Sequence, residues 1–298
     1  MSSDKAPIVV GIAESNNQEL AVAWAVAEAA RWKAPLRLVH AVVATGLFFD
    51  NPPPPSGLLD ELMRAGETVL DDAHARITQL APDLVVQREL RAAHPSSLLL
   101  TQDPTPRTVV LGAPHTHVMD RLFVGSTTTA VAAHAHCPVA VVRTAHPDQG
   151  LPTAGPVVLG LDFGTNSEMA IELAFQQAAQ RGTELLVMHA TTDSETQVRV
   201  IESFAVNWEP VLDVQRRQLD DRLARWRDKY PQVPTTVQLA HGRPRHELIE
   251  AGKRAQLLVV GSRGRSGFPG LLLGSTSHAL LHHAPCPVIV ARSTSAAS

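Results

Sequence analysis

The chain is organised around residues Leu257 to Ser277, which read LLVVGSRGRSGFPGLLLGSTS. It begins with four consecutive apolar residues, 257–260, a pattern typical of a strand that is buried on both faces of a parallel sheet. Three glycines follow at Gly261, Gly264 and Gly274, and a serine follows the last of them. The resulting spacing, G-x2-G-x9-G-S, places a glycine-rich loop directly after a buried strand.

A helix is expected after the third glycine. Three hydroxyl residues, Ser275, Thr276 and Ser277, precede His278 to Ala284, and we interpret this segment as a helix with a hydroxyl cap. Glycine lets the backbone adopt positive φ and approach a ligand without a Cβ, while the first-turn amides of a helix attract phosphate. The series therefore predicts a site for a nucleotide or another phosphorylated molecule. The alternative is that the glycines only serve turns in a surface loop.

The chain contains this unit twice, at a constant offset of 149 residues. Gly11 corresponds to Gly160, for example, and Gly125 corresponds to Gly274. Between the copies proline and glycine recur and the apolar periodicity lapses. We therefore predict an N-terminal domain, a linker and a C-terminal domain at residues 1–146, 147–156 and 157–298.

Strands and helices are expected to alternate within each copy. The expected strands of the first copy are 7–12, 36–43, 84–90, 108–111 and 139–142, and its expected helices are 19–32, 58–80, 96–102 and 126–134. The expected strands of the second copy are 157–161, 185–189, 235–240, 257–260 and 288–290. Alternation with right-handed crossovers predicts two tandem Rossmann-like α/β domains, each a five-stranded parallel sheet of order 3-2-1-4-5 with helices on both faces. Ligands of such sheets bind where the winding reverses, at the carboxyl ends of strands one and four.

Composition limits the function classes. The 298 residues are 44% hydrophobic and 18% charged, which is typical of a globular protein with a sizeable core. A formal charge of −3 gives no basic field for nucleic acid, and no Lys/Arg block suggests a membrane surface. The first residues lack a signal-peptide pattern and no apolar run approaches the roughly 18 residues of a membrane span, so we expect a cytoplasmic protein. The two cysteines, Cys137 and Cys286, are expected to be buried and free.

Asp162 ends the first strand of the second copy, beside the predicted glycine loop. Its carboxylate could accept hydrogen bonds from ribose hydroxyls or help to hold Mg²⁺ on phosphate oxygens. The alternative is a cap for the following helix, through Thr165 and Asn166. The backbone near Ala190, at the end of strand two, could contact a purine edge, whereas His189 is expected to be a hydrogen-bonded interior histidine rather than a catalyst.

The paired copies resemble the universal stress protein family in its tandem two-domain form. The resemblance covers essentially the whole chain and rests on the glycine spacing, on LGLDFGT at Leu159 to Thr165, and on CPVIV in the last strand. It implies an α/β fold of the adenine nucleotide alpha hydrolase-like type and ATP as ligand, usually with Mg²⁺ near Asp162. The expected ATP-binding residues are Gly160, Leu161, Asp162, Ala190, Val260, Gly261, Arg263, Gly264, Gly274, Ser275, Thr276 and Ser277. It also implies an intramolecular pseudo-dimer through the two fifth strands, and a homodimer or a regulatory protein partner is compatible with it.

The first copy departs from the motif at two positions. Ala13 stands where the second copy has Asp162, and His115 stands where it has Gly264. The residues that remain to form a weaker N-terminal site are Gly11, Gly112, Gly125, Ser126 and Thr127. Because the carboxylate is missing, we predict that the N-terminal site binds ATP weakly or not at all.

Catalytic signatures are absent from the sequence, which contains no G-x4-G-K-[ST], no G-x-S-x-G and no H-E-x-x-H. Arg263 and Arg265 could fold over a triphosphate, or they could be solvated loop residues. Pairs such as His134/His136 and His282/His283 complement helix C-termini and do not complete a set of metal ligands. Two functions stay open: a nucleotide-dependent regulatory module for stress response, and a slow ATP-hydrolysing or adenylate-transferring enzyme. A structural assembly protein with a vestigial site is a third alternative.

Overall fold

The computed structural model describes residues 6–13, 18–43, 57–113, 125–144, 150–164, 167–190, 209–240, 243–264 and 272–292. The chain divides into two compact units, unit 1 up to Arg143 and unit 2 from Thr144.

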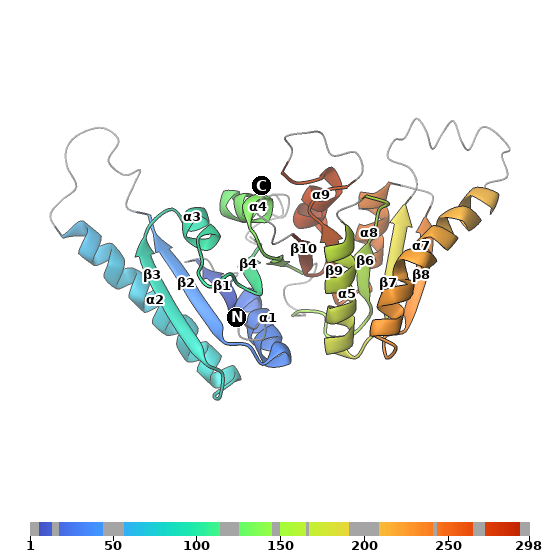
Figure 1. Cartoon of the computed structure of the whole chain (residues 1–298). Helices are drawn as coiled ribbons and strands as arrows, with labels where there is room; N and C mark the ends of the chain where they lie inside the picture. The colour runs from blue at the N-terminus through green and yellow to red at the C-terminus, as the bar shows by residue number, and fades with distance from the viewer. Residues whose placement is uncertain are drawn as a thin grey trace. The chain divides into compact units, whose positions relative to one another are not determined.

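Unit 1 is built on a five-stranded parallel sheet. Its strands are β1 (Ile8–Ile12), β2 (Leu36–Val42), β3 (Val86–Ala92), β4 (Thr108–Gly112) and β5 (Val139–Val142). Their order is β3-β2-β1-β4-β5, and Figure 1 shows β1 between β2 and β4. The helices are α1 (Gln18–Trp32), α2 (Leu58–Leu80), α3 (Pro95–Leu100) and α4 (Ser126–His134). α1 packs with α2 and α3 packs with α4, so each pair covers one face of the sheet.

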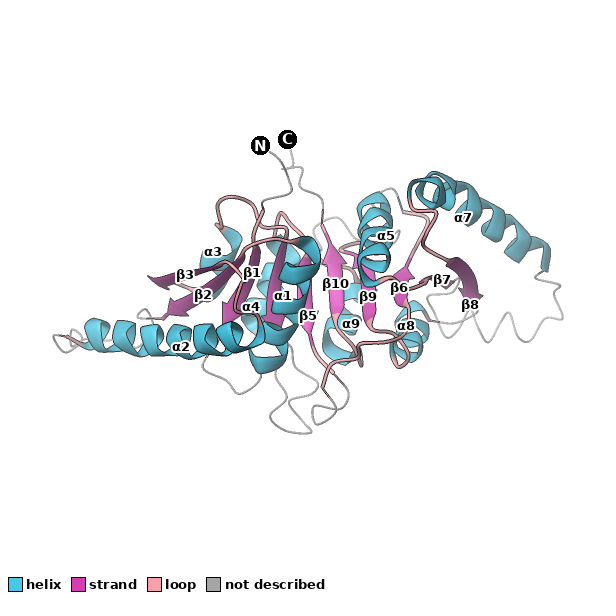
Figure 2. Ribbon diagram, turned by 90° about the horizontal axis from the view of Figure 1, so that it is seen from below, coloured by secondary structure: helices cyan, strands magenta, loops and turns pink. Residues whose placement is uncertain are grey.

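Unit 2 repeats this architecture. Its strands are β6 (Val157–Gly160), β7 (Leu185–Ala190), β8 (Thr235–Ala240), β9 (Leu257–Gly261) and β10 (Val288–Ala291), in the order β8-β7-β6-β9-β10. The helices are α5 (Glu168–Arg181), α7 (Glu209–Lys229), α8 (Pro244–Gly252) and α9 (Ser275–His283). Figure 2 shows α5 and α7 on one side of these strands and α8 and α9 on the other. The central strands are the apolar runs of the sequence, and Leu257, Leu258 and Val259 are fully buried.

Local sequence signals set several helix ends. Pro95 and Pro244 stand in the first turn of α3 and α8, where proline costs no hydrogen bond because the first amides of a helix have no intrahelical partner. α5 ends at Gly182, whose φ of 60° is the left-handed conformation that glycine adopts at little cost. The two prolines stand at matching positions of the two copies, which agrees with one architecture for both.

The predicted fold is confirmed: each unit is an α/β domain with a parallel sheet in the order 3-2-1-4-5 and helices on both faces. The predicted third strand, 84–90, was placed two residues too early, since β3 spans Val86–Ala92. Leu84 belongs instead to the turn after α2, where its amide donates to the Ala81 carbonyl at 3.1 Å. β3 is an edge strand with a half-exposed pattern, so burial gives its start no clear mark in the sequence. The pairing expected between the fifth strands stays a prediction.

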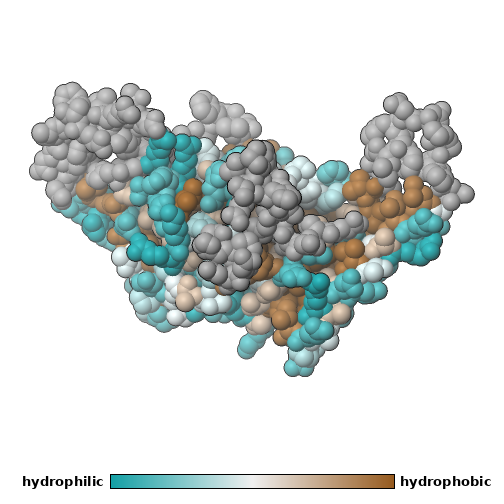
Figure 3. Space-filling view, turned by 180° about the vertical axis from the view of Figure 1, so that it is seen from behind, coloured by the Kyte–Doolittle hydropathy of each residue, from teal (hydrophilic) through white to brown (hydrophobic). Residues whose placement is uncertain are grey.

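The distribution of polar and apolar residues between surface and core is that of a globular protein. Cys137 and Cys286 are buried, as predicted. Figure 3 shows hydrophilic residues over much of one face of the molecule, with hydrophobic residues reaching the surface in a few places. The large hydrophobic residues with the greatest exposure in the described ranges are Val43, Leu59, Leu80, Val85, Val214 and Leu272. Among the described helices, none combines the length and the apolar character that crossing a bilayer requires.

Candidate functional site

Asp162 lies two residues beyond β6, in a turn that its own side chain stabilises. The Leu161 amide still donates to the Met188 carbonyl of β7 at 2.9 Å, so the chain leaves the sheet only at Asp162. One carboxylate oxygen, Oδ1, then accepts from the Gly164 amide at 3.1 Å and from the Ser167 hydroxyl at 2.9 Å. These bonds stabilise the turn before α5, and neither donor is a backbone amide of that helix. The alternative of a helix cap through Thr165 and Asn166 stays a prediction. Thr165 and Asn166 lie outside the described residues.

The second carboxylate oxygen of Asp162 lies against the glycine loop of β9. A Cβ added at Gly264 would stand 2.8 Å from Asp162 Oδ2, inside the usual contact distance. The fold thus brings together two predicted site residues that are far apart in the sequence. A side chain at position 264 would have to move the carboxylate aside, which explains why a glycine stands there.

The other glycines of the motif close the base of the same loop. The Gly274 amide donates to the Ser262 carbonyl at 2.7 Å, and a Cβ on Gly274 would lie 3.5 Å from the Arg263 Cα. Glycine can provide positive φ or close approach, and Gly261, Gly264 and Gly274 are not among the described glycines with positive φ. These glycines adopt ordinary backbone angles, and what they provide is space.

The start of α9 differs from the prediction in one respect. Gly274 is the N-cap residue, with φ −71° and ψ 156°, and no side chain caps the helix. The predicted hydroxyl cap is therefore wrong. Ser277 is buried and donates to the Gly261 carbonyl at 2.6 Å, which ties the first turn of α9 to the end of β9. An N-terminus without a side-chain cap leaves its first-turn amides to another acceptor, such as an anion.

His189 is a hydrogen-bonded interior residue, as predicted. Its ring is buried, and its Nδ1 lies 2.8 Å from the Leu161 carbonyl, which can only accept, so Nδ1 carries the proton. The Phe163 ring packs edge-on against it at 4.4 Å. The first copy repeats the contact between His40 and the Ile12 carbonyl at 2.8 Å. The histidine thereby holds together the ends of two neighbouring strands.

The remaining predicted residues of unit 2 lie at the carboxyl edge of the sheet or pack beneath it. Ala190 ends β7 beside β6, and Val260 is buried next to Gly160 in the β6–β9 pair. A Cβ on Gly160 would come within 2.7 Å of a Leu248 methyl and 2.9 Å of a Val260 methyl. Packing alone accounts for glycine at position 160. Arg263 is exposed.

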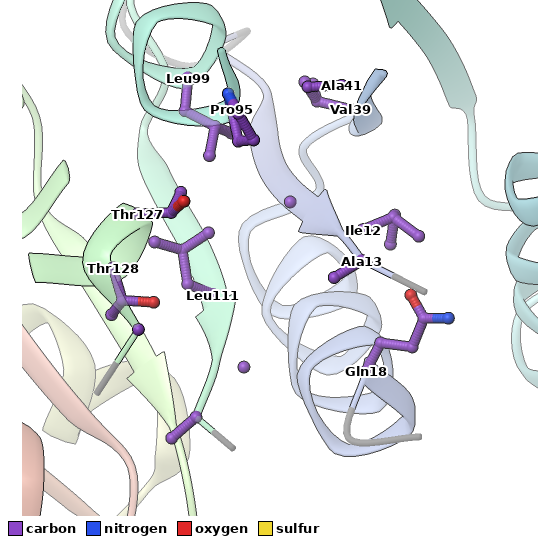
Figure 4. Close-up of a pocket in the computed structure, with 14 residues that line it drawn as sticks. Ile12, Ala13, Gln18, Val39, Ala41, Pro95, Leu99, Leu111, Thr127 and Thr128 are labelled. Carbon is purple, nitrogen blue, oxygen red and sulfur yellow. The ribbon is translucent and has the colours of Figure 1, made fainter. Parts of the chain in front are cut away.

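In unit 1 the corresponding place holds a pocket of about 210 Å³ (Figure 4). Its described lining residues are Gly11, Ile12, Ala13, Gln18, Val39, Ala41, Pro95, Leu99, Leu111, Gly112, Ala113, Gly125, Thr127 and Thr128. Four of the five residues predicted for the weaker site are among them, and Ser126 is not. None of these lining residues is charged, because Ala13 replaces the aspartate. His115 lies outside the described residues, as does Arg265.

Arg222 on α7 is a residue that sequence reasoning missed. Its guanidinium donates to the Asp162 carbonyl at 3.1 Å and to the Gly164 carbonyl at 2.9 Å. Its Nε lies 3.6 Å from a carboxylate oxygen of Glu168. The internal repeat could have revealed it, since the matching position of the first copy is Ala73.

Comparisons with known proteins agree on the family. Residues 6–143 and 154–292 each match the Universal stress protein family. The chain is 34% identical over 291 residues to a universal stress protein of Mycobacterium tuberculosis, and the alignment covers 96% of each chain. It is 32% identical over 292 residues to one of Mycolicibacterium smegmatis, again with 96% of each chain covered. The crystal structure of a universal stress protein from Archaeoglobus fulgidus matches with a TM-score of 0.67 at 17% identity, over 97% of each chain. The chain therefore belongs to the universal stress protein family and contains two tandem domains of it.

Proposed function

We propose that unit 2 binds ATP between the end of β6 and the loop after β9, and that the chain is a nucleotide-dependent regulatory module in a stress response. The observation that carries the proposal is the position of the Asp162 carboxylate against Gly264. An oriented carboxylate can accept hydrogen bonds from a ribose. A closely approaching backbone and a helix N-terminus without a side-chain cap can bind phosphates.

Each part of the site has a chemical role in this proposal. The carboxylate of Asp162 accepts hydrogen bonds from ribose hydroxyls. Backbone groups near Ala190 and Val260 contact the purine, and the first-turn amides of Ser275 to Ser277 meet the phosphates. Arg263 is exposed at the base of the loop, where a guanidinium can neutralise phosphate charge.

The donor set at this site suits Mg²⁺ that arrives with the nucleotide. Mg²⁺ is commonly held by one or two carboxylates together with substrate phosphates and waters, and Asp162 supplies one carboxylate. The described residues contain no group of three His, Cys, Asp or Glu side chains that could hold a metal by themselves. When bound, Mg²⁺ would offset the negative charge of the phosphates.

Unit 1 lacks the features that carry the proposal. Ala13 stands at the position of Asp162 and offers no carboxylate, and none of the described residues that line the pocket is charged. A multiply charged ligand without paired charges is costly to desolvate. We therefore propose that unit 1 binds ATP weakly or not at all. A cytoplasmic location, where MgATP is abundant, fits the proposal.

The proposal is tested by purifying the full chain, identifying any nucleotide that co-purifies, and following phosphate release over hours. We expect intact ATP to be retained, with release far below about 1 s⁻¹, the low end of usual enzyme turnover. Turnover near that rate would instead support the ATP-hydrolysing enzyme. A chain that retains no ATP and gains no thermal protection from it contradicts the proposal.

A further inference from the structure

We infer that Arg222 is a positioning residue for nucleotide binding in unit 2, acting through the turn that orients the Asp162 carboxylate; this inference rests on the proposed function. Arg222 lies on α7, an element that contributes none of the predicted ATP-binding residues. Its side chain is 22% exposed, so most of the guanidinium is enclosed by protein.

The geometry of the guanidinium explains how it fixes the turn. Its donors lie in one plane at fixed angles, so two of them can bind two carbonyls only if those carbonyls hold a fixed separation. The carbonyls it binds, at 3.1 and 2.9 Å, belong to Asp162 and Gly164. These residues flank Phe163, so Arg222 clamps both ends of the turn.

This turn then sets the direction of the Asp162 carboxylate. Within it, the Gly164 amide and the Ser167 hydroxyl bind Oδ1 of Asp162, at 3.1 and 2.9 Å. With Oδ1 held by the turn, Oδ2 faces Gly264, where the proposed nucleotide site lies. If the turn relaxes, the carboxylate loses the orientation that ribose binding requires.

Glu168 holds the arginine from the other side. It is the first residue of α5, and its carboxylate lies 3.6 Å from Arg222 Nε and also pairs with Arg225. Trp226 Nε1 donates to the same carboxylate at 3.4 Å. Glu168 therefore forms ion pairs with two arginines of α7. Of these two, Arg222 is the one that donates hydrogen bonds to the carbonyls of the turn.

The internal repeat separates these two roles. The first copy keeps the ion pair of Arg225 with Glu168, as Arg76 with Glu19. It has Ala73 at the position of Arg222 and Ala13 at the position of Asp162. The clamp and the carboxylate are thus present together in unit 2 and missing together from unit 1, while the neighbouring ion pair occurs in both.

The test measures MgATP affinity of the full chain by calorimetry for Arg222→Met and for the control Arg225→Met. Both variants lose one positive charge and one ion pair with Glu168, but only Arg222→Met loses the contacts to the turn. We expect Arg222→Met to weaken binding by about tenfold, as for the loss of one charge-assisted contact, and Arg225→Met to leave it nearly unchanged. The melting temperature of each variant without ATP checks that it folds.

A double-mutant cycle with Asp162→Ala identifies the route of the effect. If Arg222 acts through the carboxylate, Arg222→Met causes no further loss of affinity in the Asp162→Ala background. Wild-type affinity in Arg222→Met, or an undiminished loss in that background, overturns the positioning role while leaving ATP binding intact. Absence of ATP binding by the wild-type chain overturns the proposed function itself, and with it the role of Arg222.

Discussion

An alanine at Gly264 would collide with the carboxylate of Asp162. The added Cβ would stand 2.8 Å from Oδ2, whereas ordinary contacts begin at 3.4 Å, so the two groups must separate by about 0.6 Å. That movement strains the bonds that orient Oδ1, to the Gly164 amide and the Ser167 hydroxyl. A hydrogen bond to a charged group contributes about 1.5–3 kcal/mol, so we expect Gly264→Ala to weaken MgATP binding by about ten- to a hundredfold.

The matched control is Gly125→Ala in unit 1, the unit proposed to bind ATP weakly or not at all. Its added Cβ would meet nothing within 4 Å. Calorimetry on the full chain gives both affinities, and melting temperatures without ATP show whether either variant loses stability. The reasoning is refuted if Gly264→Ala binds MgATP like the wild type, or if both variants weaken binding equally.

Two further predictions concern stability. Gly155 has φ +102°, and a Cβ on it would lie 2.1 Å from the Arg254 carbonyl oxygen. Backbone strain alone costs about 1–3 kcal/mol. Because the collision adds to this strain, Gly155→Ala should lower the free energy of unfolding by more than that amount. The control Gly182→Ala shares positive φ but meets open space, so equal losses in urea denaturation would contradict the collision argument. Burial lowers the pKa of His278, and the nearby charge of His282 lowers it further. Below about pH 6.5 the unfolded chain therefore binds more protons than the folded chain, so the stability of the folded chain falls as pH decreases. His278→Gln should flatten the decline of the melting temperature between pH 7 and 5, a range set by the usual histidine pKa of about 6.5, and an unchanged decline would show that other groups cause it.

Much of the fold could be predicted from the sequence because its signals are local and repeated. The buried run 257–260, the prolines that open α3 and α8, and the constant offset between the copies each indicate the same alternating architecture. The start of β3 could not be predicted, because an edge strand has one partner and Val85 before it is exposed.

The site was predictable only in part, for a different reason. The glycine spacing indicates a close approach, but the sequence does not show what approaches; the fold shows that it is Asp162 at Gly264. The hydroxyl of Ser277 looked like a helix cap, yet it bonds to the Gly261 carbonyl on the neighbouring strand. Arg222 lies on α7 and donates to the carbonyl of Asp162, which is 60 residues away in the sequence. Such a contact depends on tertiary packing and cannot be predicted from a local sequence pattern.

The central claim is that the carboxylate of Asp162 and the glycine loop bind one nucleotide in unit 2. Calorimetric titration of the full chain with MgATP, for the wild type and for Asp162→Asn, tests it most directly. We expect one ATP bound per chain, with a marked loss of affinity in Asp162→Asn and little change in its melting temperature without ATP. Two ATP molecules bound per chain with equal affinity, no binding by the wild type, or unchanged binding by Asp162→Asn would contradict it.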